Sequence, residues 1–380
     1  MSSSTDLKIK TPKISSISDD RGKLLFTIEN CDVSVANALR RTLLSDIPTV
    51  VIDTEKTTIK IIENTTMLNN EILKQRLGCI PVNIKSSSKY YKYIDQLNVV
   101  IDMENTGDQI QYVTTENFKL KEMKSSKFVK QNKVSEIFPS NSITKDYIIF
   151  ARLKPKLSKN IPGERLHIEA PLKIATAKED GRYNVVSACA YGNAIDPVLQ
   201  EKAKTKFVEE LQKENPDITA KDLEYEEKNW MLLQGKQQIK LDAFNFRVET
   251  VGVYNNRELV SMGCDVIKSN CDNIIKQAQE NKIEIVENPI VNENSFDVIL
   301  MNEDYTMGKL IEYMLYEEYY KKRDVLGFVG FIKRHPHDSH SIVRMIFNDK
   351  NIANKENILN ILVTILNGIK EMYEQISKNF

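Results

Sequence analysis

Two stretches far apart in the chain predict the same structural unit. The first copy, residues 26–44, reads FTIENCDVSVANALRRTLL, and the second copy, residues 298–316, reads VILMNEDYTMGKLIEYMLY. Each opens with alternating apolar residues, as a half-buried strand does. Each then places Asp and Ser or Thr where a helix would begin, because their side-chain oxygens can accept the free amide hydrogens of a first turn. Two such units predict two related domains that pack as a pseudo-symmetric pair. The alternative is that two unrelated strand–helix units match by chance.

The two copies align without a gap. Polar residues match at the predicted turn, and apolar or small residues match along the predicted helix. The matched pairs are Asn30 with Asn302, Asp32 with Asp304, Ser34 with Thr306, Ala36 with Gly308, Leu39 with Ile311 and Leu43 with Leu315.

Composition restricts the class of protein. A chain of 380 residues with 41% hydrophobic and 28% charged residues predicts two or three globular domains. Lys and Arg together number 53, as do Asp and Glu, so the basic excess of a dedicated nucleic-acid binder is missing. The first residues have no apolar signal region, and no stretch approaches the roughly 20 apolar residues of a membrane span. The cysteines, without any CxxC, predict free thiols in a reducing compartment: Cys31, Cys79, Cys189, Cys264 and Cys271.

Two long predicted helices carry wide apolar stripes. One covers residues 258–280 and the other residues 356–378. Because an apolar stripe needs a partner, we expect the two helices to pack against each other and form a core between the two halves of the chain. The expected core residues are Leu259, Met262, Val266 and Ile274 in the first helix and Ile358, Leu362, Ile365, Ile369 and Met372 in the second.

The middle of the chain alternates short apolar runs with polar turns and predicts a β-rich domain, starting with a strand over 49–63. A highly charged stretch at about 199–239 contains a helical pattern and predicts a surface excursion. The expected division is a first strand–helix domain at 1–50 plus 240–282, an inserted β-rich domain at 51–239 and a second strand–helix domain at 283–380.

The most specific motif lies within residues 30–84, which contain ANALRRTLLSDIPTVVID and then NTTMLNNEILKQRLGCIPVNI. This stretch resembles the alpha-type assembly subunits of multisubunit RNA polymerases: the amino-terminal domain of bacterial alpha, the archaeal D subunit and the third-largest subunit of eukaryotic RNA polymerase II. Asn70 stands where the family has an acidic residue. The residues that carry the resemblance are Asn37, Leu39, Arg40, Arg41, Ile47, Pro48, Thr49, Glu71, Arg76, Leu77, Gly78, Ile80 and Pro81.

The second half resembles the small partner of that subunit, the archaeal L or eleventh-subunit type. Such partners are usually separate proteins, and a fused version resembles the arrangement in polymerases of large DNA viruses. The residues that carry this resemblance are Asn302, Glu303, Asp304, Thr306, Met307, Gly308, Leu310, Ile311, Gly330, Lys333, His335 and Pro336.

The resemblance implies an α+β fold of two pseudo-symmetric alpha-type dimerisation domains, packed through long helices, with the β-rich insert in the first half. It implies a noncatalytic assembly platform for the two largest polymerase subunits and one or more small subunits. It implies no cofactor, since the catalytic Mg²⁺ belongs to the large subunits, and neither sequence-specific nucleic-acid contact nor membrane contact. The expected location is intracellular: the cytoplasm (viral factory) or virion for a viral protein, otherwise the nucleus.

The partner-binding residues that the resemblance implies come from two helices and the turn after the second. Adjacent arginines point about 100° apart on a helix, so one of Arg40 and Arg41 can pair inside the protein while the other reaches a partner. Glu71 and Arg76 are expected to fix their short helix and the turn that follows, with partner contact as a second role. The set is Asn37, Arg40, Arg41, Glu71, Arg76, Gly78 and Pro81.

Other features allow rival interpretations. The cluster His335, His337, Asp338 and His340 could bind a metal, but its spacing matches no closed zinc site, and a polar hairpin is the expectation. The family's zinc-loop region contains no cysteine here, so we expect no zinc.

Cys189 and His167 could in principle form a catalytic dyad, although no nucleophile–base motif supports an enzyme and no catalytic residue is expected. Tyr90, Tyr91 and Tyr93 with Lys89 and Lys92 could stack single-stranded nucleic acid, with a surface that touches another subunit as the alternative. A free-standing interaction module with the same dimerisation fold is the remaining rival.

Overall fold

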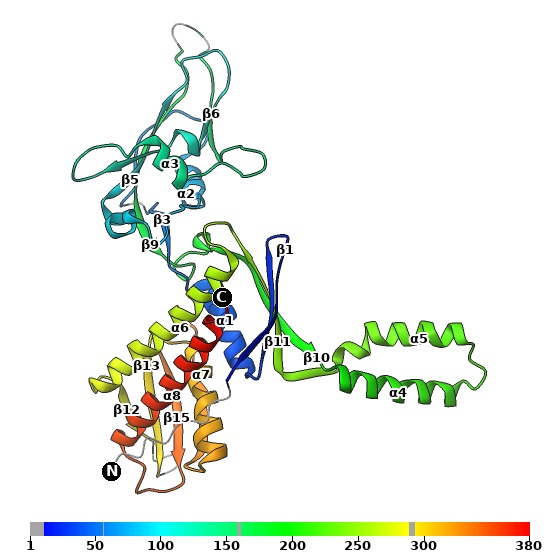
Figure 1. Ribbon diagram of the computed structural model, residues 1–380. Helices are drawn as coiled ribbons and strands as arrows, with labels where there is room; N and C mark the ends of the chain where they lie inside the picture. The colour runs from blue at the N-terminus through cyan, green and yellow to red at the C-terminus, as the bar shows by residue number, and fades with distance from the viewer. Residues whose placement is uncertain (1–10, 56, 157, 159–160, 289–292) are drawn as a thin grey trace. The chain divides into compact units, whose positions relative to one another are not determined.

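The computed structural model describes the chain except residues 1–10, 56, 157, 159–160 and 289–292 (Figure 1). The chain divides into two compact units. The first unit comprises the described residues up to Leu43 together with Ala188–Glu249 and Asn256–Phe380, and the second comprises Leu44–Ser187 and Thr250–Asn255.

The amino-terminal part of the first unit is a four-stranded antiparallel sheet with α1 (Val33–Ser45) directly after its second strand. Buried residues alternate along β2, as the sequence predicts for a half-buried strand. Pro48 follows α1 closely, and a proline cannot continue a helix because its nitrogen has no hydrogen to donate. The strand order is β1 (Lys13–Asp20), β2 (Lys23–Glu29), β11 (Ile239–Thr250) and β10 (Val186–Ile195).

The charged excursion consists of two helices, α4 (Pro197–Glu214) and α5 (Ala220–Leu232), followed by the short helix η4 (Gln234–Gln237). Asp196 and Thr219 cap the two long helices. No residue of α4 is buried, and in α5 only Trp230 is, with its ring centroid 5.8 Å from that of Phe207. The predicted helical surface excursion is therefore present, with one aromatic pair as its principal packing contact.

The carboxy-terminal part of the first unit contains the second copy. Its antiparallel sheet has the order β12 (Glu284–Glu287), β13 (Ser295–Met301), β15 (His340–Phe347) and β14 (Leu326–Ile332). Helix α7 (Tyr305–Leu315) follows β13 and continues into a π-helical turn, η5 (Tyr316–Lys322). The order strand, turn, helix thus recurs as the sequence predicts.

Two long helices, α6 (Asn256–Gln279) and α8 (Lys355–Ser377), lie side by side in the first unit (Figure 1). Ser261 contacts Ser377 with 2.9 Å between the hydroxyl oxygens, and Asp272 pairs with Lys370. The partner residue number falls as the number on α6 rises, so the helices run antiparallel. Each buries ten residues, because each has a broad apolar stripe.

The second unit is β-rich and has its own core. The central strand of its largest sheet is β9 (Arg165–Ala175). On one side β9 pairs with β5 (Leu97–Glu104), which in turn pairs with β7 (Lys119–Glu122). On the other side β9 pairs with β3 (Thr49–Ile52) and β4 (Lys60–Asn64). The remaining elements are α2 (Asn70–Gly78), η1 (Lys89–Gln96), β6 (Gln111–Thr114), η2 (Thr115–Asn117), α3 (Gln131–Ile137), β8 (Ile149–Leu153) and η3 (Gly181–Tyr183).

The mixed sheets and helices confirm the α+β class, while the pseudo-symmetry of the two halves stays a prediction. The predicted division into three domains also stays a prediction. Residues 188–239 lie in the same unit as most of both predicted dimerisation domains, because β10 pairs with β11 in the first sheet. Within the described part of the chain, no helix is both long and apolar enough to cross a membrane.

Candidate protein-interaction site

The two copies share a backbone turn and a helix cap. Asn30 and Asn302 both have a φ of 60°, in the left-handed region that Asn tolerates better than most residues. Two residues further on, Asp32 and Asp304 each accept, through Oδ1, the backbone N–H of the second residue after them at 2.8 Å. The aligned Asn and Asp therefore perform the same local task in both copies, which satisfies an amide of the first helical turn.

Arg41 joins the first copy to the second. Its Nε donates to Thr306 Oγ1 at 2.8 Å and its Nη2 to Asp304 Oδ2 at 2.9 Å. Asp304 thus caps α7 with one oxygen and binds a guanidinium with the other. Since both charged side chains are partly exposed, the contact contributes only modestly to stability, but its two-point geometry fixes the register of the two copies.

Arg40 makes its contacts within its own helix. Its Nε and Nη2 both donate to Asn37 Oδ1, at 3.1 and 2.9 Å. Two predicted site residues, Asn37 and Arg40, are therefore brought together on α1. Of the two adjacent arginines, Arg41 is the one with a partner in the second half.

The contact between the copies is partly reciprocal. Tyr313 matches Arg41 in the alignment, and Asp32 matches Asp304. Burial raises the pKa of the Tyr313 phenol, and the negative charge of nearby Asp32 raises it further. Each of these helix positions thus lies near the cap aspartate of the other copy.

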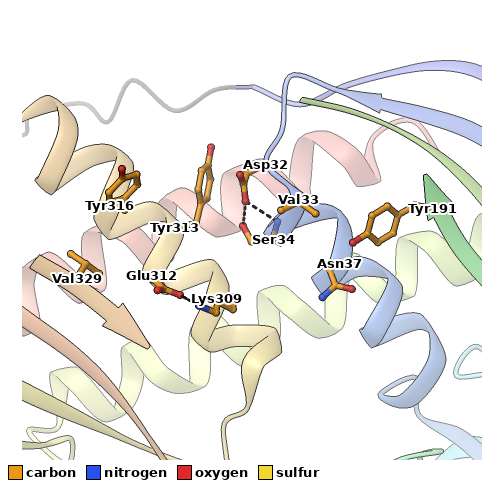
Figure 2. A pocket seen from close by; sticks show the side chains of 10 residues that line it. All are labelled: Asp32, Val33, Ser34, Asn37, Tyr191, Lys309, Glu312, Tyr313, Tyr316 and Val329. Atoms are coloured by element: carbon orange, nitrogen blue, oxygen red, sulfur yellow. Dashed lines mark hydrogen bonds and ion pairs between the residues drawn. The ribbon is translucent and has the colours of Figure 1, made fainter. Parts of the chain in front are cut away.

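A hollow of about 470 Å³ opens beside Asp32 (Figure 2). Helices α1 and α7 form most of it, and strands β10 and β14 and the turn η5 supply the remainder. Lys309 and Glu312, an ion pair on α7, lie in its wall. The lining residues are Asp32, Val33, Ser34, Asn37, Tyr191, Lys309, Glu312, Tyr313, Tyr316 and Val329.

In the second unit, α2 holds the next two predicted site residues. Glu71 lies in the first turn, where its negative charge interacts favourably with the positive end of the helix dipole. Its Oε1 is 3.5 Å from Lys74 Nζ. Arg76 donates through Nε to the carbonyl oxygen of Phe150 and through Nη2 to that of Ile149, both at 2.8 Å. Arg76 therefore tethers α2 to β8, while the role expected for it in fixing the turn after α2 stays a prediction.

The end of α2 leaves no room for a side chain. A Cβ at Gly78 would lie 2.6 Å from Arg182 Nη1 and 3.2 Å from Thr54 Oγ1. Arg182 donates to Asp180 Oδ2 through Nη2 at 2.7 Å and through Nε at 2.9 Å. These bonds hold the pKa of the Asp180 carboxyl below its usual range. Gly78 is thus required by a fixed guanidinium, whereas Pro81 is exposed.

The predicted partner-binding residues are divided between the two units. Asn37, Arg40 and Arg41 belong to the first unit, and Glu71, Arg76, Gly78 and Pro81 belong to the second. Their role in partner binding stays a prediction.

Most of the predicted helical core is buried, with two exceptions. Met262 and Val266 are half-buried, while Gly263, Cys264, Ile267 and Cys271 face the core instead. At Gly263 a Cβ would lie 3.0 Å from Leu43 Cδ2, so α6 approaches α1 closely there. The buried members of the predicted set are Leu259, Ile274, Ile358, Leu362, Ile365, Ile369 and Met372.

The histidine-rich segment is the turn between β14 and β15. Asp338 Oδ2 accepts the backbone N–H of His335 at 3.0 Å, and His335 Nδ1 accepts that of His337 at 3.2 Å. These bonds define a polar hairpin, as expected. Among the described residues no group of three or more His, Cys, Asp or Glu is arranged to hold a metal ion, and metal and cofactor independence stays a prediction.

The rival enzymatic interpretation gains no support from Cys189. Burial raises the pKa of its thiol to about 12, so the nucleophilic thiolate is scarce near neutral pH. Cys189 belongs to the first unit and His167 to the second.

The tyrosine-rich segment forms η1. Tyr90 and Tyr91 pack against the core of the second unit, and Tyr93 is exposed. Since two of the three rings are partly used in packing, the segment offers little of the continuous aromatic surface that would stack successive bases.

Sequence comparisons identify the family. The chain matches the RNA polymerase Rpb3/Rpb11 dimerisation domain over residues 25–271. It is 26% identical to a conjugation stage-specific protein of Tetrahymena thermophila, over 68% of this chain and 92% of that protein.

Two further relatives are polymerase subunits by name. The chain is 23% identical to subunit rpac1 of DNA-directed RNA polymerases I and III of Dictyostelium discoideum, over 70% of this chain and 81% of that protein. It is 22% identical to DNA-directed RNA polymerase subunit Rpo3 of Methanosphaera stadtmanae, over 69% of this chain and 97% of that protein. The match with the dimerisation domain covers more than half of the chain and includes the cap at Asp32, the arginine pair on α1 and most of α6. The chain therefore belongs to the RNA polymerase Rpb3/Rpb11 dimerisation domain family.

Proposed function

We propose that this chain is a noncatalytic assembly-platform subunit of a multisubunit DNA-directed RNA polymerase. The observation that carries the proposal is the family match over residues 25–271, which spans both units. The relatives that are named as polymerase subunits align with most of their own length, so the resemblance is not confined to a short motif.

In this proposal the chain combines the two members of a heterodimer. Three contacts support an intramolecular pair: the antiparallel packing of α6 with α8, the bond from Arg41 to Asp304, and the buried bond from Tyr373 Oη to the carbonyl oxygen of Val35 at 2.9 Å. Joining the partners in one chain raises their effective concentration to roughly the mM range and fixes their ratio at one to one. Such a fusion resembles polymerases of large DNA viruses, which favours a viral factory or a virion as the place of action, with the nucleus as the alternative.

The two largest subunits of the polymerase are the proposed partners, together with one or more small subunits. The partner surfaces are α1 around Arg40 and the end of α2 around Gly78 and Pro81. The catalytic Mg²⁺ and the contacts with nucleic acid belong to the large subunits, and this chain works by bringing those subunits together.

Affinity purification of the tagged chain from its native source, with mass spectrometry, tests the proposal. We expect two proteins larger than about 100 kDa to copurify, through interfaces of more than roughly 1,200 Å² each. Recovery of the chain alone at low salt would contradict the proposal. Recovery of partners unrelated to transcription would favour a free-standing interaction module instead.

A further inference from the structure

The two cap aspartates differ in what their second oxygen does. Asp304 Oδ1 caps α7, and Asp304 Oδ2 accepts a bond from the guanidinium of Arg41. Asp32 Oδ1 accepts both the backbone N–H of Ser34 at 2.8 Å and its hydroxyl at 2.6 Å. Among the described residues, no arginine or lysine pairs with Asp32, because the position that matches Arg41 is Tyr313.

The space near Asp32 is open to solvent and bounded by aromatic rings. It belongs to the hollow of Figure 2, where Tyr313 and Tyr316 lie on one side of Asp32 and Val33 lies beside it. Val33 is 49% exposed and Tyr316 is 40% exposed, so both present apolar surface to an incoming chain.

The lysines around the hollow already have acidic partners. Lys309 pairs with Glu312, and Lys321 pairs with Glu317 at 2.7 Å while its ammonium lies 4.8 Å from the centre of the Tyr316 ring. The bond to Glu317 raises the pKa of Lys321, and the negative charge of nearby Asp32 raises it further. The ammonium of Lys321 is nevertheless bonded to Glu317, so the carboxylate of Asp32 has no direct ion pair among the described residues and can accept a cation from outside. A cation is the complementary group for a carboxylate beside aromatic rings.

We propose that this hollow receives an arginine side chain from another polymerase subunit, which binds Asp32 Oδ2 as Arg41 binds Asp304 Oδ2 in the other copy. The inference rests on the proposed function, since the arginine is supplied by a partner subunit. The guanidinium meets the carboxylate, and the aliphatic stem lies on Val33 and the tyrosine rings. Arginine fits better than lysine because its planar, weakly hydrated fork can bond a carboxylate while stacking on an aromatic ring.

Two variants test this site in opposite ways. Asp32→Asn keeps an Oδ1 that can cap α1 but removes the charge. Tyr313→Arg places a guanidinium at the position equivalent to Arg41, so that the chain fills its own site. Asp265→Asn removes the same charge from an exposed carboxylate elsewhere, which pairs with Lys268 on the same helix.

The tagged variants are purified with their partners from the native source at stepped salt concentrations, and their melting temperatures are compared with that of the unaltered chain. We expect Asp32→Asn and Tyr313→Arg each to reduce the recovery of one partner subunit about tenfold at physiological salt, without a lower melting temperature. We expect Asp265→Asn to have no effect on recovery.

The outcomes separate the two proposals. If the unaltered chain and both variants recover the same polymerase subunits equally well, the arginine site is wrong and the proposed function stands. If the unaltered chain recovers no polymerase subunit, the proposed function is wrong. The proposed arginine site is then wrong as well, because no polymerase subunit supplies the arginine.

Discussion

The two copies of the strand–turn–helix unit agree in backbone and differ in side-chain chemistry. In both, a left-handed Asn and a capping Asp begin the helix. In the second copy the cap aspartate is closed off by Arg41, whereas in the first copy it lies beside Tyr313 at the edge of a hollow. The capping Asp therefore accounts for the helix start that both copies have. The residue opposite it differs: Arg41 bonds to Asp304, whereas Tyr313 leaves the hollow beside Asp32 open.

A second difference lies in the sheets. In the second half, Asp297 on β13 is opposite Arg344 on β15 and accepts bonds from its Nε and Nη2, the latter at 2.7 Å. In the first half, the matching register position on β2 is Leu25, opposite Arg247 on β11. Arg247 pairs instead with Glu249 on its own strand, in an ion pair that is more exposed than that of Asp297 with Arg344. Because exposed pairs contribute less to stability, the second half should lose more stability at low pH than the first.

Destroying the shared helical core should have the largest effect, because it removes the packing that places the two copies together. Leu362 and Ile365 are fully buried, so replacing both with Asp would bury unpaired charge at a cost of several kcal/mol per site. That total rivals the stability of an entire domain, about 5–15 kcal/mol. We expect aggregation and binding of a hydrophobic dye, measured by light scattering and fluorescence.

The matched control uses the exposed face of the same helix. Asn360 and Asn367 are exposed on α8, so replacing both with Asp adds the same charge without burying it. We expect this variant to remain monomeric with a nearly unchanged melting temperature. Equal behaviour of the two double variants would mean that α8 does not pack in a shared core.

Removing the half-buried ion pair between Asp297 and Arg344 should have the next largest effect. Asp297→Asn should lower the free energy of unfolding by about 1.5–3 kcal/mol, the range for hydrogen bonds to charged groups. Bonds from Arg344 hold the pKa of the Asp297 carboxyl below its ordinary value of about 3.9. Its contribution is therefore full above about pH 5 and is lost as the pH falls through the lowered pKa.

Urea unfolding at stepped pH measures this difference between the halves. The gap in stability between the unaltered chain and Asp297→Asn should be constant above about pH 5 and shrink below about pH 4. Leu25→Asn, at the matching position of the first half, should lower stability by an amount that does not change with pH in that range. A gap for Asp297→Asn that persists unchanged to pH 2 would refute the ion-pair explanation.

The two adjacent arginines should separate into a structural and a surface residue. Arg41→Ala should lower the free energy of unfolding by about 1 kcal/mol, because it removes the bonds to Thr306 and Asp304. Arg40→Ala should change it by less than about 0.5 kcal/mol and instead weaken the binding of a large subunit. Thermal melts and copurification of each single variant distinguish the roles, and a larger loss of stability for Arg40→Ala would reverse them.

Long periodic elements were predictable from sequence, because a broad apolar stripe or a strict alternation leaves a clear signal. Helices α6 and α8 lie within about two residues of their predicted limits. The strand expected over 49–63 is two strands, β3 and β4, which pair with successive parts of β9. They are separated by a turn in which Asp53 accepts the N–H of Glu55 and lies 3.7 Å from Lys173. Apolar periodicity does not report such a buried polar turn.

Contacts between distant residues were less predictable. Gly263, Cys264 and Cys271 form much of the buried face of α6, but small residues give little apolar signal, and Met262 and Val266 were expected in their place. The sequence indicated that one arginine of the pair could bind internally, but not which one. The reason is that the partners of Arg41 lie more than 260 residues further along the chain, and only the packed fold brings them within reach.

In the proposed function, the two halves form one heterodimer-like pair inside a single chain. A specific protease site placed between Glu287 and Ser295 allows the connection to be cut in the folded protein. After cleavage, gel filtration with light scattering should show one peak with the mass of the intact chain, because α6 stays packed on α8 and β12 stays paired with β13. Two separate peaks, each of a soluble and folded half, would contradict the account.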